Sequence, residues 1–224
     1  MWNDFIRLLF PETCATCGIS LYLNEKSICT FCIQQLPKTN YHKLYDNPVK
    51  KVFDGRILVE KAFCYLLFKK GSKTQKILHQ LKYKNKEILG IELGMMYGKD
   101  LISDEQNNFD LILPVPLHPI KLAKRGYNQS AAFARGISQT LNISVDEKNV
   151  IRIKNTETQT KKSRLERWLN VSDVFKVNDP SKLQNKHVLI VDDVITTGAT
   201  IEAMANTLLS VGCSKISIAS IACA

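Results

Sequence analysis

Four kinds of segment are missing from this chain of 224 residues, and each absence excludes a class of protein. No apolar run approaches the roughly 20 residues that cross a bilayer, so no membrane-spanning helix is expected. The stretch MWNDFIRLLF contains Asp4 and Arg7 and lacks the long uncharged segment of a signal peptide. Internal repeats and low-complexity tracts are also missing, so neither a repeat architecture nor a compositional tail is expected. We therefore expect a globular cytoplasmic protein in a reducing compartment.

Acidic residues are fewer than basic ones: 21 against 31, which gives a formal net charge of +10. This balance favours polyanionic partners such as nucleic acid or phosphorylated metabolites, although many basic proteins use such charge only to stay soluble. Hydrophobic residues make up 45% of the chain and charged residues 23%, which is typical of globular proteins. The length allows one α/β domain with a full core beside a small module.

The most informative stretch runs from His187 to Thr200 and reads HVLIVDDVITTGAT. Its apolar run 188–191 predicts a buried parallel strand, with Asp192 and Asp193 where that strand stops. From Ile201 the apolar residues recur at helical spacing, and Gly212 is placed to end the helix. The pattern is therefore a strand, two acids, a small loop and a helix N-terminus.

Each part of this stretch suits a sugar phosphate. The backbone N–H groups and the positive dipole end of a helix attract phosphate, and Gly198 lets the backbone approach closely. Two adjacent carboxylates can accept hydrogen bonds from a ribose diol, directly or through a magnesium-bound water. The alternative is an ordinary strand-to-helix turn in which Asp and Thr cap the helix. The residues expected to bind the phosphate are Thr196, Thr197, Gly198, Ala199 and Thr200.

Four of the seven cysteines form a pattern of two C-x-x-C turns, Cys14/Cys17 and Cys29/Cys32. Such turns suit tetrahedral zinc, and residues 1–45 contain too few large apolar groups to build a core of their own. We expect a structural zinc module there, although free thiols or a redox pair would share the pattern. The other three are expected to be small buried hydrophobes without disulfides, namely Cys64, Cys213 and Cys223.

The segment 56–86 is expected to contain one or two strands followed by an amphipathic helix over 73–82. Seven lysines between Lys69 and Lys86 make this region basic. They are either a solvated surface or, with Tyr83 for base stacking, a nucleic-acid site. The next helix, over 88–102, carries Gly90, Gly94 and Gly98 at a spacing that indicates close packing against a neighbour.

A second buried strand is expected over 109–116, and a helix through Leu141 should follow the basic and polar segment after it. Ligands of open parallel sheets collect at the carboxyl ends of strands, so this segment could face the same crevice as Asp192 and Asp193. Its cations suit a departing diphosphate, although the prolines could merely shape an exposed turn. Residues 152–175 are polar and basic, and could form either a hood that closes over the site or a surface loop with a short helix at 165–169.

At this point the sequence resembles a known family. Val188 to Thr200 resembles the phosphoribosyl pyrophosphate (PRPP) motif of type I phosphoribosyltransferases. Together with the four-cysteine module, the whole chain is similar to the ComF family of the ComFC competence type. Tyr127 replaces the commoner Phe, and Lys162 stands where an apolar residue is usual, which puts only the packing of the hood in doubt. The further matching positions are Pro114 to Pro119, Arg125 to Gln129, Arg152, Thr156, Gln159, Arg167, Asn170 and Val171.

The resemblance implies an α/β fold: a type I phosphoribosyltransferase-like parallel sheet flanked by helices, with a zinc-ribbon-like module at 1–45 and the main domain at 46–224. It implies that Asp192, Asp193 and Arg125 act catalytically, with magnesium accompanying PRPP and zinc holding the module. Possible partners are single-stranded DNA, a competence helicase and other DNA-uptake proteins. Besides the loop, the residues expected to bind PRPP are His118, Lys121, Lys161, Lys162 and Arg164.

The function that the resemblance implies is processing of single-stranded DNA during natural transformation. No residue stands out as a general base, so the sequence leaves the phosphoribosyl acceptor and turnover itself open. Two alternatives remain: a PRPP sensor without enzymatic activity, and a single-stranded-DNA-binding accessory protein.

Overall fold

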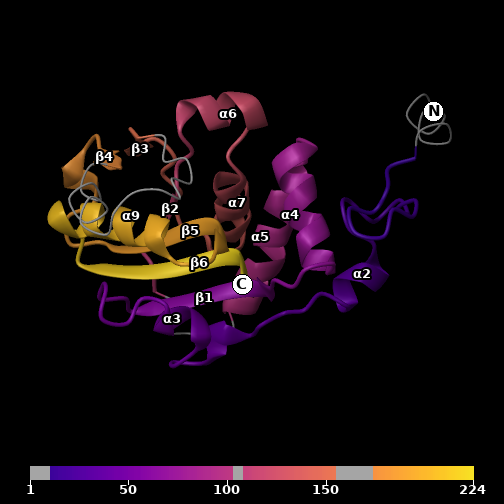
Figure 1. Ribbon diagram of the computed structural model, residues 1–224, viewed down its shortest axis with the longest axis horizontal. Coiled ribbons are helices and arrows are strands. Elements are labelled where there is room, and N and C mark those ends of the chain that lie inside the picture. The colour runs from indigo at the N-terminus through magenta and orange to yellow at the C-terminus, as the bar shows by residue number, and fades with distance from the viewer. Residues whose placement is uncertain (1–10, 103–107, 155–173) are drawn as a thin grey trace, which may run out of the picture.

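The computed structural model describes residues 11–102, 108–154 and 174–224. Its main sheet is wholly parallel, with strand order β1-β6-β5-β2. This confirms the expected class, an α/β protein with a parallel sheet flanked by helices (Figure 1). The strands are β1 (Lys61–Leu67), β2 (Leu111–Pro114), β5 (His187–Ile195) and β6 (Lys215–Cys223).

Alternation along the strands divides the core into two layers, because successive side chains of a strand point to opposite faces. Leu189 and Val191 of β5 belong to the first core layer, which packs against three helices: α4 (Lys73–Tyr83), α5 (Glu87–Ile102) and α7 (Gln129–Leu141). Val188 and Ile190 belong to the second core layer, which packs against α9 (Ala199–Ser210). All four helices were expected from the sequence within a few residues.

The close packing predicted for the glycine-bearing helix is found between α5 and α7. A Cβ on Gly94 would lie 2.1 Å from the carbonyl oxygen of Phe133, and a Cβ on Gly136 would lie 2.0 Å from that of Ile91. The two backbones therefore touch, and this contact fixes α7, which carries residues of the site.

The smaller elements surround this core. A second sheet has two antiparallel strands, β3 (Val150–Arg152) and β4 (Phe175–Val177), at the two ends of the expected hood. Of the strands expected between 56 and 69, only β1 forms. The remaining elements are α2 (Thr30–Gln34), η1 (Tyr41–Lys43), α3 (Pro48–Lys51), α6 (Pro119–Arg125) and η3 (Pro180–Lys182).

The cysteine-bearing segment shares the first core layer with the main sheet. Cys14, Ile28 and Cys32 are buried in the same cluster as Tyr65 and Leu78. This packing suits a segment with too few apolar groups for a core of its own. The domain boundary at residue 45 stays a prediction.

Candidate functional site

The two acids lie at the carboxyl edge of the sheet. Strand β2 pairs with β5 only as far as Pro114 opposite Val191, so Asp192 and Asp193 extend beyond the end of β2. On its other side β5 continues against β6 to Ile195. The expectation that the strand stops at the acids was therefore wrong: hydrogen bonding to β6 carries it past them, while the shorter neighbour leaves them open on the β2 side.

The carboxyl group of Asp192 is held by several neighbours. Its Oδ1 accepts hydrogen bonds from Ser130 Oγ at 3.1 Å and from the backbone N–H of Asp193 at 2.8 Å. Burial and the charge of Asp193 raise the pKa of Asp192 to about 7, against the opposing effects of these hydrogen bonds and of Lys82. Burial lowers the pKa of the nearby Arg152, and the charge of Asp192 acts in the opposite direction. Asp192 is thus an oriented carboxyl group close to its titration point at neutral pH.

Asp193 pairs with a lysine from another part of the chain. Lys82 Nζ, in the last turn of α4, lies 3.0 Å from Asp193 Oδ2. The sequence placed Lys82 among the surface lysines, and nothing in its spacing separates it from its neighbours. The fold alone brings it to the acids.

The loop after β5 ends in a helix N-terminus, as predicted. Gly198 is the N-cap residue of α9 with φ +72°, and a Cβ there would lie 2.7 Å from Phe53 Cε1. Thr196, Thr197 and Ala199 are exposed. The first N–H groups of a helix have no intrahelical acceptor, so this loop presents donors at an open surface.

Arg56 braces the loop from the N-terminal side. Its Nη1 donates to the backbone oxygens of Thr197 at 2.6 Å and of Val52 at 3.0 Å, and its Nη2 forms an ion pair with Glu202 of α9. The sequence interpretation missed Arg56, because a single arginine between a turn and a strand carries no distinguishing pattern. The loop is therefore held by a segment about 140 residues away in the chain.

Two of the candidate residues in the segment after β2, Arg125 and His118, contact residues of the same segment. Arg125 Nη1 donates to Gln129 Oε1 at 2.7 Å, and His118 is the N-cap residue of α6, its Nδ1 accepting from the N–H of Ile120 at 3.4 Å. Lys121 lies on α6, and within the described ranges it forms no hydrogen bond or ion pair with either acid. The roles assigned to Arg125, His118 and Lys121 stay predictions.

A hollow of about 380 Å³ lies beside this segment, between α6, the start of α7 and β3. Apolar side chains such as Leu117 and Tyr127 line it together with Asn128 and Arg152. Three residues expected to bind PRPP, and five of the further matching positions, lie outside the described residues: Lys161, Lys162 and Arg164, and Thr156, Gln159, Arg167, Asn170 and Val171.

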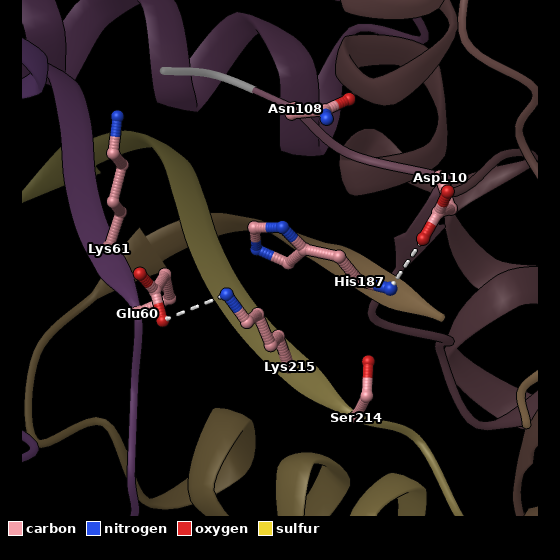
Figure 2. Close-up of a pocket in the computed structure, with 7 residues that line it drawn as sticks. All are labelled: Glu60, Lys61, Asn108, Asp110, His187, Ser214 and Lys215. Atoms are coloured by element: carbon pink, nitrogen blue, oxygen red, sulfur yellow. Dashed lines mark hydrogen bonds and ion pairs between the residues drawn. The ribbon is translucent and has the colours of Figure 1, made fainter. Parts of the chain in front are cut away.

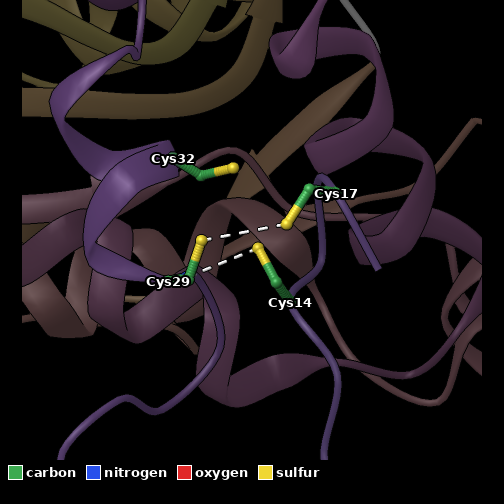
Figure 3. A group of neighbouring side chains, drawn as sticks. All are labelled: Cys14, Cys17, Cys29 and Cys32. Carbon is green, nitrogen blue, oxygen red and sulfur yellow. Dashed lines mark hydrogen bonds between the residues drawn. The ribbon is translucent and has the colours of Figure 1, made fainter. Parts of the chain in front are cut away.

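The four cysteines of the two C-x-x-C turns come together as expected (Figure 3). Their sulfur atoms all lie within 4.8 Å of one another, and Cys17 Sγ is 3.8 Å from Cys29 Sγ. Burial raises the pKa of the Cys14 thiol, but backbone N–H groups and the Thr16 hydroxyl outweigh it and lower the pKa to about 6. The distances between the four sulfur atoms make the cluster suited to hold a metal ion.

Of the remaining cysteines, only Cys213 is a free thiol, buried as expected. Cys64 of β1 and Cys223 of β6 form a disulfide, so the expectation of unpaired thiols was wrong for these two. The neighbouring parallel strands bring together residues separated by 159 positions, a proximity that the sequence spacing does not reveal.

A second hollow, of about 360 Å³, lies at the opposite edge of the sheet, where β5 and β6 begin (Figure 2). Its polar groups largely satisfy one another. His187 Nε2 lies 2.9 Å from Ser217 Oγ, Asp110 Oδ2 accepts from the backbone N–H of His187 at 2.7 Å, and Lys215 lies 3.9 Å from Glu60. We read these contacts as structural.

In the part of the chain that the structure describes, no helix is both long and apolar enough to cross a membrane.

A family model described as "Phosphoribosyl transferase domain" matches residues 102–223. DNA utilization protein YhgH of Escherichia coli (strain K12) is 26% identical over 227 residues, which cover 94% of this chain and 96% of that protein.

Two competence proteins match about half of the chain. Competence protein F of Haemophilus influenzae is 33% identical over 110 residues, covering 49% of this chain and 48% of its own. Competence protein ComFC of Bacillus subtilis is 30% identical over 102 residues, covering 46% of this chain and 39% of its own. Among solved structures, an adenine phosphoribosyltransferase from Thermoanaerobacter pseudethanolicus is 20% identical with a TM-score of 0.40, covering 63% of this chain and 83% of that one.

Proposed function

Since the chain belongs to the phosphoribosyl transferase domain family, in its ComF branch, we propose that it binds PRPP at the end of β5. One observation carries the proposal. An oriented acid pair, Asp192 and Asp193, stands at the open carboxyl edge of the sheet and is followed directly by an exposed loop that starts a helix. The acids suit a ribose diol and the loop suits its 5′-phosphate.

The reaction we propose is transfer of the phosphoribosyl group. A nucleophile forms a bond to C1 of the ribose while the bond from C1 to the diphosphate oxygen breaks, and pyrophosphate leaves with the electron pair. Asp192 and Asp193 orient the ribose hydroxyls, and the N–H groups and hydroxyls of 196–200 hold the monophosphate. Magnesium bound to the diphosphate would offset its charge, and carboxylate oxygens are ligands that suit this ion. Stabilising the leaving group electrostatically is the main catalytic requirement.

Calorimetric titration with PRPP and magnesium tests the site. Replacing both acids (Asp192→Asn with Asp193→Asn) should weaken binding about 100-fold, because two charge-assisted sets of hydrogen bonds to the ribose are lost. Asp46→Asn is the control, since that exposed acid pairs with the exposed Lys51 of α3, and this variant should bind PRPP like the wild type. Unchanged affinity in the double variant would contradict the assignment.

Pyrophosphate release separates an enzyme from a sensor. The protein is incubated with PRPP, magnesium and candidate acceptors, including purine bases and single-stranded DNA. Release above the acceptor-free background supports transfer. PRPP binding without release supports sensing, the alternative that keeps the same site.

We propose zinc as the metal of the four-cysteine cluster. Four thiolates at the usual Zn–S distance of about 2.3 Å stand about 3.8 Å apart at the corners of a tetrahedron. The separation of 3.8 Å between Cys17 Sγ and Cys29 Sγ matches this edge. The ion would be held by Cys14, Cys17, Cys29 and Cys32 and would fasten this segment to the main core.

We also propose a role in the use of DNA, most simply in uptake or processing of single strands, from the names of the relatives. A specific surface supports direct binding. Lys73 Nζ lies 5.4 Å from the centre of the exposed Phe31 ring, and on the same helix the His79 and exposed Tyr83 rings are 4.9 Å apart. Exposed aromatic rings between lysines suit stacked bases along a phosphate backbone.

This second function is tested by titrating fluorescent single-stranded DNA at several salt concentrations. Affinity should fall steeply with salt, because binding releases counterions. Charge reversal at Lys73 and Lys76 together with Tyr83→Ala should abolish binding and leave PRPP affinity unchanged. Wild-type DNA affinity in this triple variant would exclude the surface.

A further inference from the structure

We propose that Lys82 is a substrate-binding residue of the same site, and that its ammonium group joins Asp193 to the diphosphate of PRPP. This inference rests on the proposed function and adds a residue that the sequence assigned to the outer surface. The geometry distinguishes Lys82 from the other lysines of α4. Its Nζ is 3.0 Å from Asp193 Oδ2, and only 26% of its side chain is exposed.

The last turn of α4 is fastened to the segment after α6. The carbonyl oxygen of Leu81, the residue before Lys82, accepts a hydrogen bond from Tyr127 Oη at 2.7 Å and another from Gln129 Nε2 at 3.4 Å. Arg125 in turn donates to the side chain of Gln129. Three side chains of the RGYNQ stretch thus fix the helix end that carries Lys82. We infer that this stretch acts on PRPP in part through Lys82.

The positive charge of the Lys82 ammonium group suits it to contact the diphosphate. A diphosphate bound next to Asp192 and Asp193 would be repelled by both acids, and a lysine ammonium between them would reduce this repulsion in addition to the magnesium proposed above. A lysine ammonium has three donors, and the contact with Asp193 uses one of them. Among the described residues Lys82 forms no further ion pair, so its other two donors can meet phosphate oxygens. Arg152 of β3 lies close enough to Asp192 for the charge of that acid to act on its pKa, whereas Lys82 pairs directly with Asp193.

Two ligands that differ only in the diphosphate test the inference: PRPP and ribose 5-phosphate, each titrated calorimetrically with magnesium into the full-length protein. Lys82→Met should weaken PRPP binding about tenfold or more and change ribose 5-phosphate affinity less than about twofold, because a charge-assisted contact to the diphosphate is lost. Lys82→Arg should restore part of the PRPP affinity. Lys99→Met, at an exposed position of α5, is the matched control and should bind both ligands like the wild type.

Equal weakening of both ligands by Lys82→Met would show that Lys82 only supports the fold of the site, and unchanged PRPP affinity would show that it takes no part. Either result overturns the inference while the proposed function stands. A wild-type protein that binds neither ligand would instead overturn the proposed function, and the inference with it.

Discussion

The four-cysteine cluster and the acid-and-loop site are built in opposite ways. All four sulfur atoms of the cluster come from the short stretch between Cys14 and Cys32. The other site takes its acids from β5 and gathers their partners from α4, α7 and the segment after α3. A site whose residues are close in the sequence can be predicted from their spacing. A site whose residues come from distant segments can be predicted only for the segment that has a recognisable motif.

We also expect the two regions to determine different properties, stability for the cysteine cluster and ligand binding for the acid-and-loop site. Three of the four cysteines, Cys14, Cys29 and Cys32, are buried in the first core layer, so we expect the cluster to contribute to stability. The acid pair stands at an open edge where β2 has ended, so we expect it to carry ligand binding. The following predictions test this division, beginning with the largest effect.

Replacing two buried ligands of the cluster, Cys14→Ser with Cys32→Ser, should abolish metal binding. It should lower the free energy of unfolding by about 3 kcal/mol or more, because metal binding is coupled to folding and both side chains lie in the core. Plasma emission spectroscopy measures the metal and thermal unfolding the stability. Cys213→Ser, a buried thiol outside the cluster, should keep the metal.

In contrast to its stability, the PRPP affinity of the Cys14→Ser, Cys32→Ser variant should be almost unchanged. At a temperature where it is still folded, binding should stay within about twofold of the wild type, since no hydrogen bond or ion pair among the described residues joins a cysteine of the cluster to the acids or the loop. If this variant also lost PRPP affinity, the cysteine cluster would be needed for ligand binding as well as for stability, which would contradict the account.

Removing the contacts that Arg56 makes to the loop 196–200 should lower PRPP affinity more than stability. Arg56→Ala should weaken PRPP binding about tenfold, equivalent to about 1.4 kcal/mol, because the loop loses its hydrogen bond at Thr197 and its link to α9. Arg56→Lys should recover part of this affinity. Calorimetry measures both.

Lys51→Ala is the matched control for Arg56. Its ion pair with Asp46 is exposed and lies in the same part of the chain, so its removal should change PRPP affinity little. An Arg56→Ala protein that binds PRPP like this control would show that the loop keeps its shape without the brace.

The smallest expected effect is on the pH dependence of stability. Because the pKa of Asp192 is raised to about 7, the folded protein holds this proton more tightly than the unfolded chain does. The folded state therefore binds more protons than the unfolded chain between about pH 4 and pH 7, and the contribution of Asp192 to the free energy of unfolding falls as pH rises through this interval.

Asp192→Asn should flatten this part of the curve, which urea unfolding at a series of pH values measures. Asp193, Lys82 and Arg152 face the same group and stay in place in the variant. Asp46→Asn should keep the wild-type slope. A variant with the slope of the wild type would show that Asp192 does not titrate in this range.

The sequence predicted the elements whose pattern is local. The run 188–191, the amphipathic helix of α4 and the glycine spacing of α5 each depend on neighbours within one element, and each was confirmed. The two C-x-x-C turns belong to the same class. Bringing their four sulfur atoms together needed only the turn geometry and a short connection.

The sequence did not predict contacts that the chain topology creates. Cys64 and Cys223 meet because β1 and β6 are neighbours, and Asp192 continues the strand because β6 outlasts β2. Arg56 and Lys82 reach the site across long stretches of sequence as single basic residues in a basic chain. Position in the fold, and not residue type, separates these two from the other lysines and arginines.

The central claim is that the acid pair and the loop after it bind PRPP together. A crystal structure of the full chain with PRPP and magnesium tests this most directly. The account predicts the 5′-phosphate on the N–H groups of residues 196–200, the ribose hydroxyls on Asp192 and Asp193, and the diphosphate within reach of Lys82. A ligand bound away from the carboxyl end of β5, or held with its diphosphate on the loop and its ribose away from the acids, would contradict it.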